Sequence, residues 1–322
     1  MGVIETYRTW LPVGPATPEV SLGEGGTPLL RARRLSEELG LDLRLKLEGA
    51  NPTGSFKDRG MVVAVAKALE AGATTLVCAS TGNTAASAAA YAARAGLRAV
   101  VLTPAGATAD AKRAQARATG ARVVELRGTF DDALRLCREL AAEPGYALVN
   151  SVNPHRLEGQ KTVAFELAEG LGVMPDVVAL PFGGGGNTCA VAKGFEELGE
   201  VPRLVAGEAA ERATTWASAI RIGEPAHAAE VSALVRGGRV EVVTLDEAEI
   251  RSAWLELARL EGVFCEPASA ASVAALRRVE LSPGALVVCI LTGHGLKDTG
   301  AVPDDGVTPV EPTLDAVLEA IA

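Results

Sequence analysis

Short apolar runs that end in turn residues alternate with alanine-rich stretches along most of this 322-residue chain. The run 74–80 leads through a polar turn into an alanine-rich segment, and the runs 98–104, 121–127 and 146–151 repeat the alternation. Strands of a parallel sheet are buried on both faces, and each needs a helical crossover to reach the next. The pattern therefore predicts an α/β fold built from doubly wound, mostly parallel sheets.

A strand is also expected at 43–48, before the alternating runs of residues 74–151. The second half of the chain continues the alternation of strands and helices. The expected elements of the second half are a helix from about His155 to Leu171, strands at 176–182, 203–209 and 285–293, and a helix at 246–262. No low-complexity linker separates the two halves, so the two units are expected to pack against each other.

Composition favours small molecules as the partners of this chain. The net charge is −9, which disfavours a general nucleic-acid binder. No apolar run is long enough to span a membrane and no signal-peptide pattern is present, so the expected location is the cytoplasm. The five cysteines form no CxxC pair and the three histidines no HExxH cluster, so neither a disulfide framework nor a metal site is expected. A GxSxG elbow is also missing.

Polar loops follow several of the expected strands, at the edge where ligands bind in open α/β sheets. The turn STGNT (80–84) offers hydroxyls, an amide and the first N–H groups of a helix, which together form an anion receptor or, alternatively, an ordinary N-cap cluster. The loop GGGGN (183–187) can turn several backbone N–H groups into one concavity, which suits a phosphate. Its spacing matches neither GxGxxG nor GxxxxGK[ST].

Two further loops carry charged side chains. The segment 150–156 (NSVNPHR) places Arg156 at a strand-to-helix junction, where it is either a solvated side chain or a ligand for carboxylate or phosphate. The segment 291–298 (LTGHGLKD) places Thr292 and His294 after the most apolar strand, and a lone histidine is more often structural than a general base.

Lys57 stands where a cation is unfavourable. The turn residues NPTG (51–54) stop the preceding strand, and a helix is expected to begin with Ser55 as N-cap and Asp58 as its capping-box partner. Lys57 then lies at the positive end of the helix dipole. If the amine is also partly desolvated, its pKa is lowered and it becomes a nucleophile. An amine, a phosphate cup and a polar turn at one sheet edge indicate pyridoxal phosphate, with a nucleotide-binding protein or a plain surface lysine as alternatives.

Several segments in order along the chain resemble the threonine synthases, a family of fold-type II pyridoxal-phosphate-dependent enzymes. They are LGEGGTPLL, KLEGANPTGSFKDRGM, CASTGNTAASAAAYAARAG, NSVNPHRLEGQKT, AIRIG, EGVFCEPASA and LTGHGLKD. The resemblance implies a tryptophan synthase β-like fold with the cofactor in the cleft between two domains. The larger domain, 1–50 with 151–322, would hold the cofactor phosphate, and the smaller domain, 51–150, would carry the substrate-carboxylate loop. A cytoplasmic homodimer is also implied.

The resemblance further implies a role for each site residue. Lys57 would form the covalent link to the cofactor and move protons. Asn83 would contact the ring hydroxyl, Thr292 would face the pyridine nitrogen, and Gly183, Gly184, Gly185, Gly186 and Asn187 would hold the cofactor phosphate. The substrate carboxylate would meet Ser80, Thr81 and Thr84, and the substrate phosphate would meet Thr84, Asn150, Ser151 and Arg156.

The implied activity is that of a carbon–oxygen lyase, which converts O-phospho-L-homoserine and water to L-threonine and phosphate. One feature departs from the family, because its phosphate loop usually reads GNAGN where this chain has four glycines before Asn187. Four-glycine loops resemble those of serine and threonine dehydratases. A diverged eliminase, or a replacement enzyme acting on another amino acid, is therefore the alternative.

Overall fold

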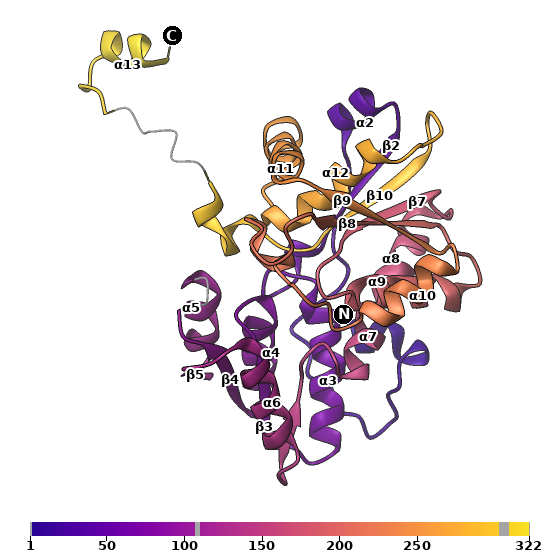
Figure 1. The fold of residues 1–322 in the computed structure, drawn as a ribbon, viewed down its shortest axis with the longest axis vertical. Coiled ribbons are helices and arrows are strands. Elements are labelled where there is room, and N and C mark those ends of the chain that lie inside the picture. The colour runs from indigo at the N-terminus through magenta and orange to yellow at the C-terminus, as the bar shows by residue number, and fades with distance from the viewer. Residues whose placement is uncertain (1, 107–109, 303–308, 322) are drawn as a thin grey trace.

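The computed structural model describes residues 2–106, 110–302 and 309–321, and these form two sheets with helices on both faces (Figure 1). The larger sheet has six strands in the order β1-β2-β10-β7-β8-β9, and only the β1–β2 pair among them is antiparallel. Its strands are β1 (Leu29–Arg31), β2 (Asp42–Leu47), β7 (Val177–Pro181), β8 (Arg203–Ala209), β9 (Val240–Leu245) and β10 (Leu286–Leu291).

The smaller sheet is entirely parallel and has four strands in the order β5-β4-β3-β6. Its strands are β3 (Thr75–Ala79), β4 (Arg98–Pro104), β5 (Arg122–Leu126) and β6 (Tyr146–Leu148). Both sheets thus have the α/β, mostly parallel architecture that the alternating pattern predicts.

Helices cover both faces of each sheet, as the buried clusters show. In the larger sheet, α2 (Arg33–Leu39), α11 (Glu247–Glu261) and α12 (Ala271–Ala275) pack on one face. The other face is covered by α8 (Thr162–Leu171), α9 (Gly186–Leu198) and α10 (Ala228–Arg236).

The smaller sheet packs against α3 (Lys57–Glu70) and α4 (Asn83–Arg94) on one face and against α6 (Phe130–Ala141) on the other. The remaining helices are α1 (Val3–Tyr7), α5 (Asp110–Ala118), α7 (Pro154–Gln160) and α13 (Leu314–Ile321). Short 3-10 helices are η1 (Arg8–Trp10), η2 (Glu48–Ala50), η3 (Ser218–Ile220), η4 (Pro267–Ala270), η5 (Leu276–Arg278), η6 (Gly295–Lys297) and η7 (Thr299–Ala301).

The single helix expected from about His155 to Leu171 is wrong, because the structure divides this stretch into α7 and α8 at Lys161. The Thr162 hydroxyl donates to the carbonyl of Gly159 at 2.7 Å, and such local side-chain bonds compete with the helical ladder. The helix α7 packs against α3. Among the described helices, none is long and apolar enough to cross a membrane.

Candidate active site

Lys57 is the first residue of α3 and is tied to the end of the neighbouring strand β10. The Phe56 N–H donates to the carbonyl of Thr292 at 3.0 Å, and Ser55 forms a bridge with Gly293. Gly54 adopts φ +86°, which a side chain would strain, and this reverses the chain before the helix. The ends of β2 and β10 therefore place Lys57 and Thr292 side by side, since these two strands pair.

The expected capping box at Ser55 is wrong. Phe56 occupies the N-cap position without a side-chain bond, and the Ser55 hydroxyl has no partner within the described residues. The Asp58 carboxylate instead accepts bonds from the Thr53 N–H at 2.7 Å and from the Thr53 hydroxyl at 2.6 Å, and it also accepts one from Ser87. Asp58 is buried, so its carboxylate accepts hydrogen bonds from the buried donors of the turn and does not cap the helix.

The pKa of Lys57 is lowered from 10.5 to about 7, first by burial and then by the positive charge of Arg156, with Glu266 partly opposing both effects. The Lys57 amine also lies 4.1 Å from the centre of the Phe56 ring. About half of the free amine is therefore neutral near pH 7, as a nucleophile that attacks an aldehyde requires.

Arg156 lies near Lys57 because α3 and α7 cross with their backbones in contact. A Cβ atom on Gly60 would lie 2.4 Å from the Arg156 carbonyl, and one on Gly159 would lie 1.9 Å from the carbonyl of Arg59. Only glycine allows so close a crossing. Arg156 is fully buried, and its Nη1 donates to the carbonyl of Val149 at 2.8 Å.

Two nitrogens of Arg156, Nε and Nη2, have no hydrogen-bond partner among the described residues. Burial lowers the pKa of this guanidinium from 12.5 to about 10, so the group remains charged at neutral pH. A buried cation with unsatisfied donors is costly unless an anion binds to it. Arg156 therefore forms a candidate anion site on α7, the helix that crosses the Lys57 helix α3.

The glycine loop follows β7, the strand that pairs with β10, and leads into α9. Gly185 has φ +84°, and a Cβ atom on Gly183 would come within 3.0 Å of the Ile220 backbone. The Asn187 Nδ2 and the Thr188 hydroxyl are buried without partners in the part of the chain that the structure describes. Free donors at the start of a helix fit a phosphate group.

The STGNT turn lies at the end of β3 in the smaller sheet. The Ser80 hydroxyl accepts bonds from the N–H groups of Gly82 and Ala85, while Thr81 and Thr84 are partly exposed beside it. Asn83 begins α4, and its Nδ2 donates to Glu266 Oε2 of the larger unit at 2.7 Å. The turn thus faces the larger sheet, and the Asn83 Oδ1 is free to accept a bond.

Glu266 was not among the residues predicted from sequence, although it lies within one of the quoted segments. Its side chain is buried, and it forms an ion pair with Lys112 Nζ at 2.7 Å in addition to its contact with Asn83. Lys112 also donates to the Ser218 hydroxyl at 3.3 Å. Sequence could not reveal this cluster, because its members come from α5, η3 and the start of η4, which only the fold brings together.

The remaining predicted residues are also placed by hydrogen bonds. The Thr292 hydroxyl lies 3.2 Å from that of Ser269, so its nearest partner is another neutral group. The Asn150 side chain bonds both the N–H and the carbonyl of Ala79, and so it joins the ends of β3 and β6. The His294 Nδ1 accepts a bond from the Leu296 N–H, which favours the structural interpretation of this histidine.

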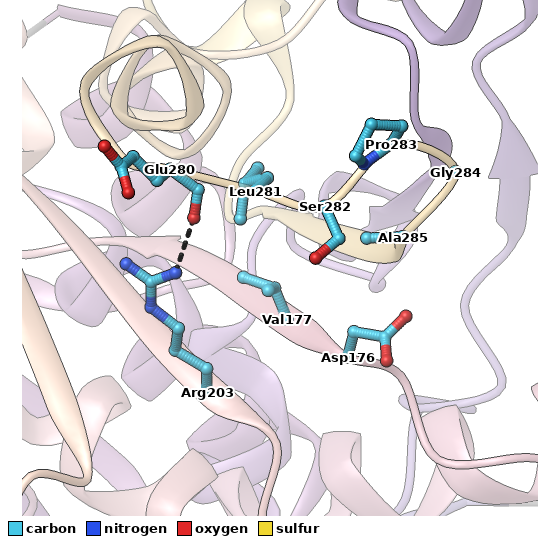
Figure 2. A pocket seen from close by; sticks show the side chains of 9 residues that line it. All are labelled: Asp176, Val177, Arg203, Glu280, Leu281, Ser282, Pro283, Gly284 and Ala285. Atoms are coloured by element: carbon cyan, nitrogen blue, oxygen red, sulfur yellow. Dashed lines mark hydrogen bonds between the residues drawn. The ribbon is translucent and has the colours of Figure 1, made fainter.

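A cavity of about 360 Å³ lies elsewhere, at the amino ends of β7 and β8 (Figure 2). Two of its charged side chains are already paired, since Arg203 donates to the carbonyl of Glu280 and Asp176 accepts from the N–H of Leu286. It is at the opposite edge of the sheet from Lys57. The cluster at the carboxyl ends of the strands is therefore the better candidate for a site.

Comparison with known proteins gives consistent results. Residues 20–293 match the model of the family described as pyridoxal-phosphate dependent enzyme. Proteins named threonine synthase, from Halalkalibacterium halodurans and from Synechocystis sp., are 49% and 48% identical to this chain. The matches cover 92% and 100% of this chain, respectively, and 90% of each relative.

Solved structures give a broader set of similarities. The crystal structure of a T.th. threonine deaminase superposes with a TM-score of 0.71 at 29% identity, over 88% of this chain and 94% of that one. The structure of O-ureido-L-serine synthase superposes with a TM-score of 0.76 at 26% identity, over 96% of this chain and 100% of that one.

Proposed function

Because the chain belongs to the pyridoxal-phosphate-dependent enzymes and, within them, to the threonine synthases, we propose that it converts O-phospho-L-homoserine and water to L-threonine and phosphate. The observation that supports this substrate most strongly is the buried Arg156, with two unpaired nitrogens close enough to Lys57 to lower the pKa of its amine. A second anion site next to the reactive lysine suits a substrate that itself carries a phosphate.

The residues present fit the cofactor. The free Asn187 amide, the Thr188 hydroxyl and the glycine backbone would donate to its phosphate, and Asn83 would contact the ring hydroxyl. Thr292 would be the partner of the ring nitrogen. When bound, pyridoxal phosphate supplies an aldehyde for amines and a ring that stabilises negative charge on the adjacent carbon. A hydroxyl at Thr292 does not enforce ring protonation, so nearby residues must help to direct the reaction.

We assign the proton transfers to Lys57. Its amine is neutral in about half of the molecules near pH 7, so it can take a proton from the substrate Cα without a further base. The Ser80, Thr81 and Thr84 turn, at the start of α4, holds the substrate carboxylate at the positive end of a helix.

A proton leaves Cβ as the phosphate leaves Cγ, and protons return to Cγ and Cα as the product forms. Arg156, the Ser151 turn and Thr84 hold the substrate phosphate during its departure. Asn150 contributes by joining β3 to β6, and the side-chain contacts already described fix it in that position. Water then adds at Cβ. The charge of Arg156 stabilises the negative charge that grows on the leaving phosphate.

We further propose that the two sheets define two domains, 51–150 and the combination of 1–50 with 151–322. Sheet membership supports this division, since β3 to β6 lie within 75–148 and the remaining strands outside it. We also propose a homodimer in the cytoplasm. An exposed apolar stripe on α13, formed by Leu314, Val317, Leu318 and Ile321, supports association with a second copy.

The test is incubation of the purified enzyme with O-phospho-L-homoserine while threonine, phosphate and 2-oxobutanoate are measured. We expect threonine and phosphate in equal amounts. In Lys57→Ala, both the imine absorbance of the cofactor and the activity should be lost, whereas Lys67→Ala, a lysine substitution on the same helix, should retain both. Release of 2-oxobutanoate without threonine would reject this substrate assignment.

That outcome would instead favour an eliminase. Two observations keep it as the second candidate: the four consecutive glycines of the loop, and the structural similarity to a threonine deaminase. An eliminase acting on serine or threonine has no substrate phosphate to bind. Arg156 would then have no phosphate partner, and its substitution would leave the Michaelis constant for such amino acids unchanged.

A further inference from the structure

His227 lies on the glycine loop, although it comes from a distant segment between η3 and α10 and shows no motif. Its backbone N–H donates to the carbonyl of Gly184 at 3.1 Å. A Cβ atom on Gly185 would lie 3.1 Å from the His227 Cβ, and one on Gly186 would lie 3.3 Å from its Cδ2. The imidazole therefore occupies the space that side chains of this loop would otherwise fill.

The same imidazole reaches the other phosphate-binding segment. Its Nε2 lies 3.1 Å from the backbone carbonyl of Ser151, so Nε2 carries the proton and donates it to this acceptor. The side chain is 9% exposed. His227 thus joins the glycine loop after β7 of the larger sheet to the turn after β6 of the smaller sheet.

The Ser151 turn is held on its other side by the smaller sheet. Asn150 bonds the backbone of Ala79, and the Asn153 Nδ2 donates to the carbonyl of Leu148 at 2.8 Å. Those contacts fix the turn relative to β3 and β6. The bond from His227 fixes it relative to the glycine loop, and so it sets the separation between the two phosphate-binding segments.

The second nitrogen of the ring does not form a comparable link. The His227 Nδ1 has no hydrogen-bond partner among the described residues, and the nearest carboxylate oxygen, Oε1 of Glu230, lies 3.5 Å away. Glu230 is more than half exposed. A neutral imidazole with its proton on Nε2 satisfies this geometry, so the link depends on a hydrogen-bond donor and not on a positive charge.

We propose that His227 is a positioning residue that determines specificity for a phosphate-bearing substrate, because it holds the Ser151 turn at the distance from the glycine loop at which that phosphate binds. The proposal rests on the proposed function. An amino acid without a phosphate does not use the Ser151 turn, so its binding is independent of this link.

Three variants of the cofactor-loaded enzyme test the proposal. His227→Phe keeps a ring of similar size and removes the donor, whereas His227→Gln keeps an amide donor. Glu230→Gln is the matched control, since it removes only the carboxylate beside Nδ1. The ligands are a phosphonate analogue of O-phospho-L-homoserine and, as the phosphate-free ligand, L-threonine. Dissociation constants are read from the change in cofactor absorbance, so the measurement needs no turnover.

We expect His227→Phe to bind the phosphonate about five- to tenfold more weakly, which is the effect of losing one hydrogen bond, and to bind L-threonine within about twofold of the parent enzyme. His227→Gln and Glu230→Gln should match the parent enzyme for both ligands. Equal weakening for both ligands in His227→Phe, or no weakening for either, would overturn the proposal, as would an effect of Glu230→Gln equal to that of His227→Phe. Failure of the parent enzyme to bind the phosphonate would instead count against the proposed function.

Discussion

Replacing Lys57 by methionine should stabilise the cofactor-free protein while abolishing its activity. The unfolded chain keeps the proton on Lys57 up to about pH 10.5, and the folded chain releases it near pH 7. Between these values the unfolded state binds more protons, so the stability of the parent protein rises with pH. Below pH 7 the folded state carries the full cost of a desolvated ammonium, and above pH 10.5 this cost disappears.

The size of the effect follows from the shift in pKa. A change from 10.5 to about 7 corresponds to roughly 5 kcal/mol at most, at about 1.4 kcal/mol for each pKa unit. The Lys57 side chain is only partly buried, and water near the amine reduces this cost. We therefore expect Lys57→Met to raise the free energy of unfolding by about 2 kcal/mol at pH 6.5 and by roughly a third of that at pH 9.5.

Urea unfolding of the cofactor-free proteins, followed by tryptophan fluorescence at both pH values, measures this difference. Lys112→Met is the control, because Lys112 is buried and already paired with Glu266 at 2.7 Å. Lys112→Met leaves the buried Glu266 carboxylate without its ion-pair partner, so this substitution should destabilise the protein by about 3 kcal/mol at both pH values. Lys57→Met would refute this prediction if it did not raise the free energy of unfolding at pH 6.5, or if it raised it equally at pH 9.5.

Three other substitutions test the site. Arg156→Lys should lower kcat/KM for O-phospho-L-homoserine at least tenfold, because an ammonium cannot bind a phosphate through two parallel bonds. The cofactor absorbance should stay unchanged, and a smaller loss of kcat/KM would argue against phosphate binding at Arg156. Glu266→Gln removes a charge that raises the pKa of Lys57, so the pH midpoint for capture of an added aldehyde by the cofactor-free protein should fall below about 7; an upward shift would contradict this. Gly60→Ala should destabilise the protein by more than about 2 kcal/mol in thermal or urea unfolding, because its Cβ would lie 2.4 Å from the Arg156 carbonyl and α7 would have to move. Near-native stability of this variant would show that α3 and α7 do not cross in close contact.

Elements with a strong periodic signal were predictable from the sequence. The strands expected at 98–104 and 203–209 match β4 and β8 residue for residue. The strand β9, Val240–Leu245, was not predicted. It lies at the edge of the larger sheet and three of its side chains are buried, so it lacks the continuous apolar run of a central strand.

Within the site, local chemistry was predictable and long-range pairing was not. The position of Lys57 after a turn and at the start of a helix was evident from NPTGSFKDRG, and the structure places it there. Glu266 and His227 were not identified, because their importance comes from burial and from partners in distant segments. The wrong capping box at Ser55 has the same origin, since the local motif does not show that Thr53 and Ser87 compete for Asp58.

The order of strands in the larger sheet has a consequence for how the chain folds during synthesis. β10 lies between β2 and β7, yet it is the last strand of the described chain to leave the ribosome. The four-stranded sheet can form as soon as residue 148 is free, whereas β2 lacks its neighbour β10 until nearly the whole chain has been made. During that interval β2 keeps an unpaired edge, which is a site where incomplete chains associate. The sheet and the site are then completed at almost the same moment, because Thr292 directly follows β10.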